Sequence, residues 1–168
     1  MRPRGSFPPH ERSPMSGRAG SDAVQADITI DAPLEEVWQA VMNPDRMSEW
    51  VTIHRKMDSA DSGPPRKGMK MKQTLCLRGA NFKVQWELVE CQDAKWAVWQ
   101  GRGPLRSHAH TEYQLSSDGD GGTRFHYVNE FKAPGGPFGK AASKALVGGL
   151  PQREAEKSLK RLKAMVEK

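Results

Sequence analysis

The chain has 168 residues, 36% of them hydrophobic, and a net charge of +6, which suits one globular domain. No apolar run approaches the roughly 18 residues that a membrane span requires, so a transmembrane protein is excluded. The two cysteines exclude a disulfide-rich fold and a cysteine-rich zinc module. We therefore expect a soluble, cytoplasmic domain with reduced thiols.

The positive charge lies at the two ends of the chain. Residues 1–22 hold four arginines against two acidic residues, and residues 138–168 hold eight basic against three acidic residues, whereas the middle is nearly neutral. A nucleic-acid-binding domain usually carries a basic stripe across a folded face, so we expect no nucleic-acid partner. The basic C-terminal end leaves open a weak contact with an anionic membrane surface.

Residues 1–22 are predicted to form a disordered tail. Half of them are proline, glycine or serine, and their scattered apolar side chains bury too little surface to offset the entropy of ordering. The segment also lacks the apolar run of a secretory signal. Met1 and Met15 both remain candidate starts, and residues 23–168 are assigned to the folded domain.

A strand and two short helices are predicted after the tail. Apolar residues alternate over 24–30, as in a half-buried strand. Asp31-Ala32-Pro33 starts a helix, because proline fits the first turn and the glutamates that follow suit the positive end of the helix dipole. Asn43-Pro44 ends it, since the residue before proline avoids helical angles. Residues 44–50 are expected to form a second helix.

The alternating segments 69–78 and 82–88 predict a β-hairpin. We place its turn at Gly79-Ala80, so that inward residues of the two strands face one another. This register pairs Leu77 with Phe82, Leu75 with Val84, Gln73 with Trp86, and Met71 with Leu88.

Three more strands are predicted at 95–101, 106–116 and 123–132. In the first of them, either Trp96 and Val98 or Ala97 and Trp99 face inward. The loop 117–122 is rich in glycine and aspartate and joins the other two as a hairpin.

The C-terminal end is predicted to be a long helix with an apolar stripe of Ala155, Leu159, Leu162 and Val166. Gly148-Gly149-Leu150-Pro151 should kink or interrupt its beginning. Since each strand has one apolar face, the pattern favours an α+β domain in which this helix covers an antiparallel sheet.

The sequence resembles a known superfamily. The run from Ile28 to Trp38, followed by Asn43-Pro44-Asp45 and Ser48-Glu49-Trp50-Val51, resembles the opening of the START-like (Bet v 1-like, SRPBCC) superfamily, in its polyketide cyclase/dehydrase and lipid transport branch. Gly122–Phe125 and Ser158–Lys163 also fit this pattern.

The resemblance implies a helix-grip fold, in which a curved seven-stranded antiparallel sheet wraps around a long C-terminal helix. It further implies an internal cavity and a hydrophobic or amphipathic ligand such as a lipid or polyketide. We expect no cofactor. The glycine-proline interruption near residue 150 departs from the unbroken helix of the family.

The candidate ligand-binding residues face the expected cavity. They combine a mostly apolar lining with a few polar groups, as small-molecule pockets do; the same residues are also compatible with a filled core whose polar groups bond one another. The set comprises Trp38, Trp50, Met71, Gln73, Leu75, Val84, Trp86, Thr111, Tyr113, Phe125, Tyr127, Asn129, Ala142 and Leu146.

We expect no metal site and no catalytic residue. Folding the last hairpin about Gly119-Asp120 places Glu112 opposite His126 and His108 opposite Glu130. This histidine–carboxylate patch is interpreted as ordinary sheet surface rather than as a zinc site. Cys76 and Cys91 are expected to be free thiols, because the predicted register separates them.

Three functions remain open from the sequence. The first is binding or transport of a hydrophobic small molecule. The second is a cyclase or aromatase acting on a ligand in the same cavity, where positioned polar groups would assist proton transfer. The third is an interaction module whose basic C-terminal helix contacts acidic partners or membranes. Oligomeric state is not predicted.

Overall fold

A computed structural model describes residues 23–132, 135 and 150–168. Its strands form one antiparallel sheet of seven strands in the order β1-β7-β6-β5-β4-β3-β2. Their bounds are β1 Val24–Ile30, β2 His54–Ala60, β3 Lys70–Leu77, β4 Ala80–Gln92, β5 Trp96–Arg102, β6 His108–Ser117 and β7 Thr123–Lys132. The predicted tail of residues 1–22 lies outside the described residues.

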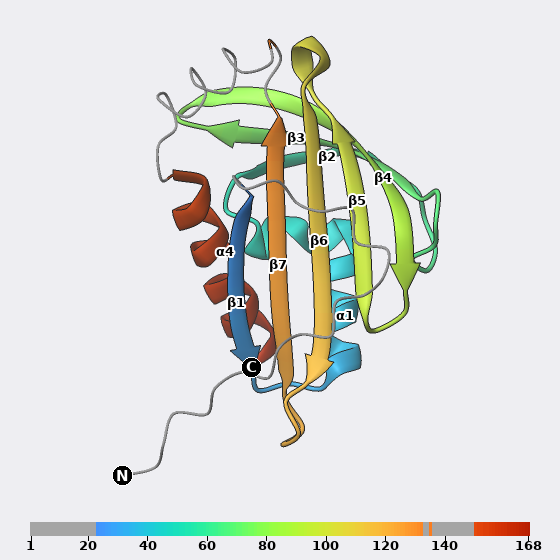
Figure 1. Cartoon of the computed structure of the whole chain (residues 1–168), viewed down its shortest axis with the longest axis vertical. Helices are drawn as coiled ribbons and strands as arrows, with labels where there is room; N and C mark the ends of the chain where they lie inside the picture. Colours follow the sequence, from blue (N-terminus) through green and yellow to red (C-terminus); the bar gives the residue numbers. More distant parts are fainter. Residues whose placement is uncertain (1–22, 133–134, 136–149) are drawn as a thin grey trace.

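The helices lie on one side of this sheet, behind it in the view of Figure 1. They are α1 (Leu34–Met42), the 3₁₀ turn η1 (Pro44–Arg46), α2 (Met47–Trp50) and α4 (Leu150–Val166), and a second turn, η2 (Pro104–Arg106), joins β5 to β6. The two short helices after the first strand and the long C-terminal helix are as predicted. The chain therefore has the expected helix-grip arrangement of the α+β class.

Local sequence signals explain where α1 and η1 begin. Pro33 caps α1, and Glu35 and Glu36 lie in its first turn, where carboxylates stabilise the helix dipole. The side chain of Asn43 accepts a hydrogen bond from the backbone N–H of Asp45 at 3.0 Å, which starts η1 as α1 ends.

Helix α4 is held by an apolar stripe and by polar contacts. Its predicted stripe is buried: Ala155, Leu159, Leu162 and Val166 are all at most 8% exposed. Ser158 Oγ accepts from the backbone N–H of Thr52 at 3.0 Å, which connects α4 to the segment before β2. Gly148 and Gly149 of the expected interruption lie outside the described residues, and the described helix begins at Leu150 with Pro151 in its first turn.

Side chains of α4 also bond to the backbone of the edge strand β1. Gln152 Nε2 donates to the carbonyl of Gln25 at 2.9 Å, and Lys163 Nζ donates to the carbonyl of Thr29 at 2.8 Å. A little beyond the strand, the N–H of Asp31 donates to the carboxylate of Glu167 at 2.6 Å. The helix therefore contacts both the inner face of the sheet and its β1 edge.

The β3–β4 hairpin has the predicted inward face but a different register. Met71 pairs with Trp86, Gln73 with Val84, Leu75 with Phe82, and Leu77 with Ala80, so our register was wrong by two residues. The reason is a tighter turn: Arg78 and Gly79 both have positive φ angles, 49° and 80°. Two such residues form the two-residue turn that matches the twist of a hairpin.

The β6–β7 hairpin also differs from its predicted register by two residues, but in the opposite direction. Glu112 pairs with Val128, His108 with Lys132, and His110 with Glu130. Ser117 pairs with Thr123, and the carboxylate of Asp118 accepts from two backbone N–H groups of the loop, which sets a longer turn than we assumed. On β5 the inward pair is Ala97 and Trp99, which are at most 1% exposed.

Strand β2 was not identified from its own pattern. It is an edge strand of seven residues, HRKMDSA, with register shifts between His54 and Lys56 and between Met57 and Ser59. These irregularities break the alternation on which sequence recognition of a strand depends.

Among the described helices, none is long and apolar enough to cross a membrane.

Candidate functional site: the inner face of the sheet

An aromatic cluster lies between the sheet and the short helices. Trp38 of α1 and Trp50 of α2 are 2% and 1% exposed. The ring of Trp50 meets Tyr113 of β6 edge-on, with 6.2 Å between centroids. Tyr113 stacks on Tyr127 at 6.0 Å and meets Phe125 edge-on at 5.6 Å. Five of the predicted ligand-binding residues are therefore buried or half-buried on the helix side of the sheet.

The other predicted residues of the described strands lie on the same face. Asn129 is half-buried, and the remaining members, at most 8% exposed, are Met71, Gln73, Leu75, Val84, Trp86 and Thr111. Ala142 and Leu146 lie outside the described residues. The face therefore gathers the predicted strand residues, and their contact with a ligand stays a prediction.

A chain of hydrogen bonds crosses β4, β3 and β2 on this face. The indole N–H of Trp86 donates to Oε1 of Gln73 at 3.2 Å, and Nε2 of Gln73 lies 2.7 Å from Nδ1 of His54. The same Nε2 approaches the sulfur of Met47 at 3.7 Å. Because an indole N–H can only donate, the amide oxygen of Gln73 faces Trp86 and its NH₂ group faces His54.

This chain determines the tautomer of His54. Since the NH₂ group of Gln73 donates, Nδ1 of His54 must accept, and the proton of the neutral ring sits on Nε2. Burial lowers the pKa of His54, which favours the neutral ring. Within the described part of the chain, Nε2 of His54 has no hydrogen-bond partner.

The lowered pKa of His54 predicts that stability falls in acid. Below the ordinary value of 6.5 the unfolded chain takes up a proton that the folded protein resists. The free energy of unfolding is therefore retained above that pH and decreases as the pH falls toward the folded pKa. Urea unfolding from about pH 8 to about pH 5 should show a shallower acid loss for His54→Phe than for the wild type. Parallel curves for the two proteins would contradict the assignment.

The two tyrosines of the cluster keep their protons at neutral pH. Burial raises the pKa of Tyr113, and the nearby Tyr127 adds to the effect. Burial also raises the pKa of Tyr127 to about 12, although a hydrogen bond with Asn129 opposes the shift. Thr111 Oγ1 makes a long contact of 3.5 Å with the amide oxygen of Asn129. Both hydroxyls are therefore available as neutral donors.

Buried indole groups on this side of the molecule lack acceptors. In the described ranges, Nε1 of Trp38, Trp50 and Trp99 is buried without a hydrogen-bond partner. A buried polar group without a partner costs about 1–3 kcal/mol, so each calls for an explanation. A bound molecule that offers acceptor atoms is one such explanation.

Sequence reasoning missed His54 and Met47 as members of this face. His54 is the first residue of the unrecognised strand β2, and Met47 begins the four-residue helix α2. The available signal was the run Trp50-Val51 followed by Ile53-His54, which places a histidine directly after apolar core residues.

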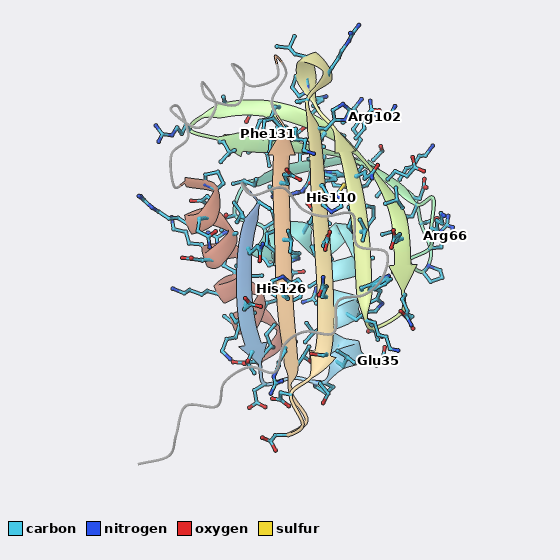
Figure 2. All side chains as sticks on the ribbon, in the orientation of Figure 1. Glu35, Arg66, Arg102, His110, His126 and Phe131 are labelled. Carbon is cyan, nitrogen blue, oxygen red and sulfur yellow. The ribbon has the colours of Figure 1, made fainter. Side chains whose placement is uncertain are left out.

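The opposite face of the sheet carries a polar groove of about 860 Å³. Two cross-strand rows of polar residues line it, one with Lys72, Arg102 and His108 and the other with Glu87, His110 and Glu130. Residues of the row between them, including Gly101 and Ala109, also border it. Figure 2 shows Arg102 and His110 at the upper part of the sheet. Of the predicted ligand-binding residues in the described part of the chain, only Met71 and Trp86 border this groove. The groove is therefore distinct from the predicted cavity.

The histidine–carboxylate patch of this outer face is arranged in pairs. His110 Nε2 lies 2.7 Å from a Glu112 oxygen, and His126 Nδ1 lies 2.7 Å from an Asp27 oxygen. In residues 23–132, 135 and 150–168, no three histidine, cysteine or acidic side chains are placed to hold a metal ion. Cys76 and Cys91 are free thiols.

Residues 21–167 match the family described as polyketide cyclase/dehydrase and lipid transport. The chain belongs to this family. Its membership supports hydrophobic small-molecule binding or cyclase chemistry in general terms, as the START-like resemblance implied. No curated protein matches the chain.

Solved structures share the fold at low identity. TTHA0849 from Thermus thermophilus has a TM-score of 0.67 and 20% identity, covering 86% of this chain and 96% of its own. CV1439 from Chromobacterium violaceum has a TM-score of 0.63 and 17% identity, covering 87% and 97%. DynU16, described as a putative protein in the dynemicin biosynthetic locus, has a TM-score of 0.60 and 17% identity, covering 88% of this chain and 48% of its own.

Proposed function

We propose that the protein binds a hydrophobic small molecule of lipid or polyketide type between the inner face of its sheet and the C-terminal helix. The family match over residues 21–167 carries this proposal. The inner face supports it, because a large aromatic surface there is combined with a few polar groups, as in small-molecule sites. In the described part of the chain, the buried carboxylates Glu112 and Glu130 are both at outer-face positions.

Mass spectrometry of the purified full-length chain tests the proposal. Organic extraction after denaturation should release an apolar molecule that a sample stripped by unfolding and refolding does not contain. Returning the extract to the stripped protein should raise its melting temperature, because a ligand that binds only the folded state stabilises it. An empty extract, together with no thermal shift from tridecane, 2-tridecanone or dodecanoic acid, would contradict ligand binding.

A cyclase acting on the same ligand is the second candidate. Tyr113, which is buried, and Tyr127, which is half-buried, favour it, since both remain protonated donors at neutral pH on the same face of the sheet. Such groups can transfer or share protons with a bound polyketone. Tyr113→Phe should then abolish turnover of a polyketone substrate while leaving the circular dichroism spectrum unchanged.

A role of α4 in binding acidic partners has less support. Lys157 forms an ion pair with Glu154 of the same helix, and Lys163 forms one with Glu167, directly after the helix ends. These pairs reduce the positive potential that an anionic surface would attract.

A further inference from the structure

We infer that His54 is the residue through which this site recognises the polar group of its ligand, as a hydrogen-bond donor held in place by Gln73 and Trp86. The ligand should then be a neutral molecule with a carbonyl or other acceptor oxygen, rather than a plain hydrocarbon or a carboxylate. This inference rests on the proposed ligand binding and names the chemistry that the site selects.

The first argument is the direction of the hydrogen-bond chain. Trp86 is 8% exposed and Gln73 is 3% exposed, and the Trp86-to-Gln73 bond at 3.2 Å orients the amide. The amide then donates to His54 across 2.7 Å. Each group of the chain, as far as Nδ1 of His54, thus has at least one hydrogen-bond partner. The N–H on Nε2 is therefore the free end of the chain, and it can donate a hydrogen bond but cannot accept one.

The second argument is the surplus of donors around this face. The indole N–H groups of Trp38 and Trp50 are buried without acceptors among the described residues. A third donor, the Tyr113 hydroxyl, keeps its proton because burial raises its pKa. A guest that completes such a site must supply acceptors, and buried donors discriminate strongly against analogues that lack them.

The third argument is charge. Buried charged side chains of the described residues are Glu112 and Glu130, which lie at outer-face strand positions. The inner face therefore offers an ionised guest no buried counter-ion in the described part of the molecule. Burial of an unpaired carboxylate there would cost more than burial of a ketone.

The first test measures the tautomer of His54 in the full chain. Long-range ¹H–¹⁵N spectra near neutral pH should show the proton on Nε2 in the wild type. Gln73→Glu keeps an acceptor for Trp86 but replaces the donor that faces His54, so Nδ1 should become protonated. The matched control is Gln85→Glu, the same change at an exposed position of the neighbouring strand, which should leave the tautomer unchanged. A wild-type ring protonated on Nδ1 would overturn the inference.

The second test measures affinity for three probes of similar chain length: tridecane, 2-tridecanone and dodecanoate. The ketone should bind the wild type about fivefold to tenfold more tightly than the alkane, as one added hydrogen bond allows. The preference should be lost in His54→Phe and retained in Gln85→Glu. Circular dichroism spectra and melting curves check that each variant is folded. If a variant does not fold, the tautomer measured on the wild type still tests the inference.

The outcomes separate the inference from the proposed function. Equal binding of ketone and alkane by the wild type would overturn the role of His54 and leave ligand binding intact. A preference for dodecanoate over the ketone would overturn the neutral-ligand assignment. Failure of all three probes to bind, with no molecule extracted from the purified protein, would overturn both.

Discussion

Replacing Leu162 with alanine is expected to lower the free energy of unfolding by about 2–5 kcal/mol. Leu162 lies on α4 and is 0% exposed, in the stripe that also contains Leu159 and Val166. The truncation removes buried apolar surface and leaves a cavity that the surrounding sheet and helices fill only in part. Equilibrium urea unfolding, followed by tryptophan fluorescence, measures the difference in the unfolding free energy.

The control for this change is Lys160→Ala on the exposed side of the same helix. It should alter the unfolding free energy by no more than about 0.5 kcal/mol, because it removes no buried contact. Similar losses for both variants would contradict the assignment to buried packing, because alanine has a higher helix propensity than either residue it replaces.

Replacing Gly101 with alanine should cost about 1–3 kcal/mol, because the added methyl group has no space. A Cβ atom at this position of β5 would lie 2.7 Å from Cγ1 of Val84 and 2.8 Å from Cε3 of Trp86. To accommodate it, the Trp86 ring must shift, and its indole N–H would move relative to Gln73. The variant should therefore lose both stability and the defined tautomer of His54.

Gln100→Ala is the neighbouring control on the exposed face of β5. It should leave the unfolding free energy within about 0.5 kcal/mol of the wild-type value and preserve the His54 spectrum. A Gly101→Ala protein as stable as the wild type would show that Val84 and Trp86 can move apart without cost.

The sequence predicts the faces of this fold better than its registers. Alternation identified the inward residues of β3, β4, β6 and β7, because a buried face imposes its period of two on every strand. Each hairpin was nevertheless misaligned by two residues, a shift that keeps every side chain on its face. Hydrophobic pattern alone cannot detect that shift, and the turn geometry at Arg78-Gly79 and after Ser117 decides it.

In the candidate site, too, the residues that depend on pattern were predicted and those that depend on register were not. The aromatic residues and Gln73 were found because they sit in regular strands and helices. His54 was missed because β2 is irregular, and the Gln73–His54 contact joins residues whose pairing depends on register shifts in that strand. Sequence pattern therefore identifies the apolar lining, whereas the polar chain that crosses it depends on the exact alignment of neighbouring strands.

The contacts between α4 and β1 have a consequence for the behaviour of the protein at high concentration. An open sheet exposes unpaired backbone groups at its outermost strands, where another polypeptide can add a strand. Gln152 and Lys163 occupy the carbonyls of Gln25 and Thr29 on that border. The C-terminal helix thereby protects one border of the sheet from intermolecular strand addition and aggregation.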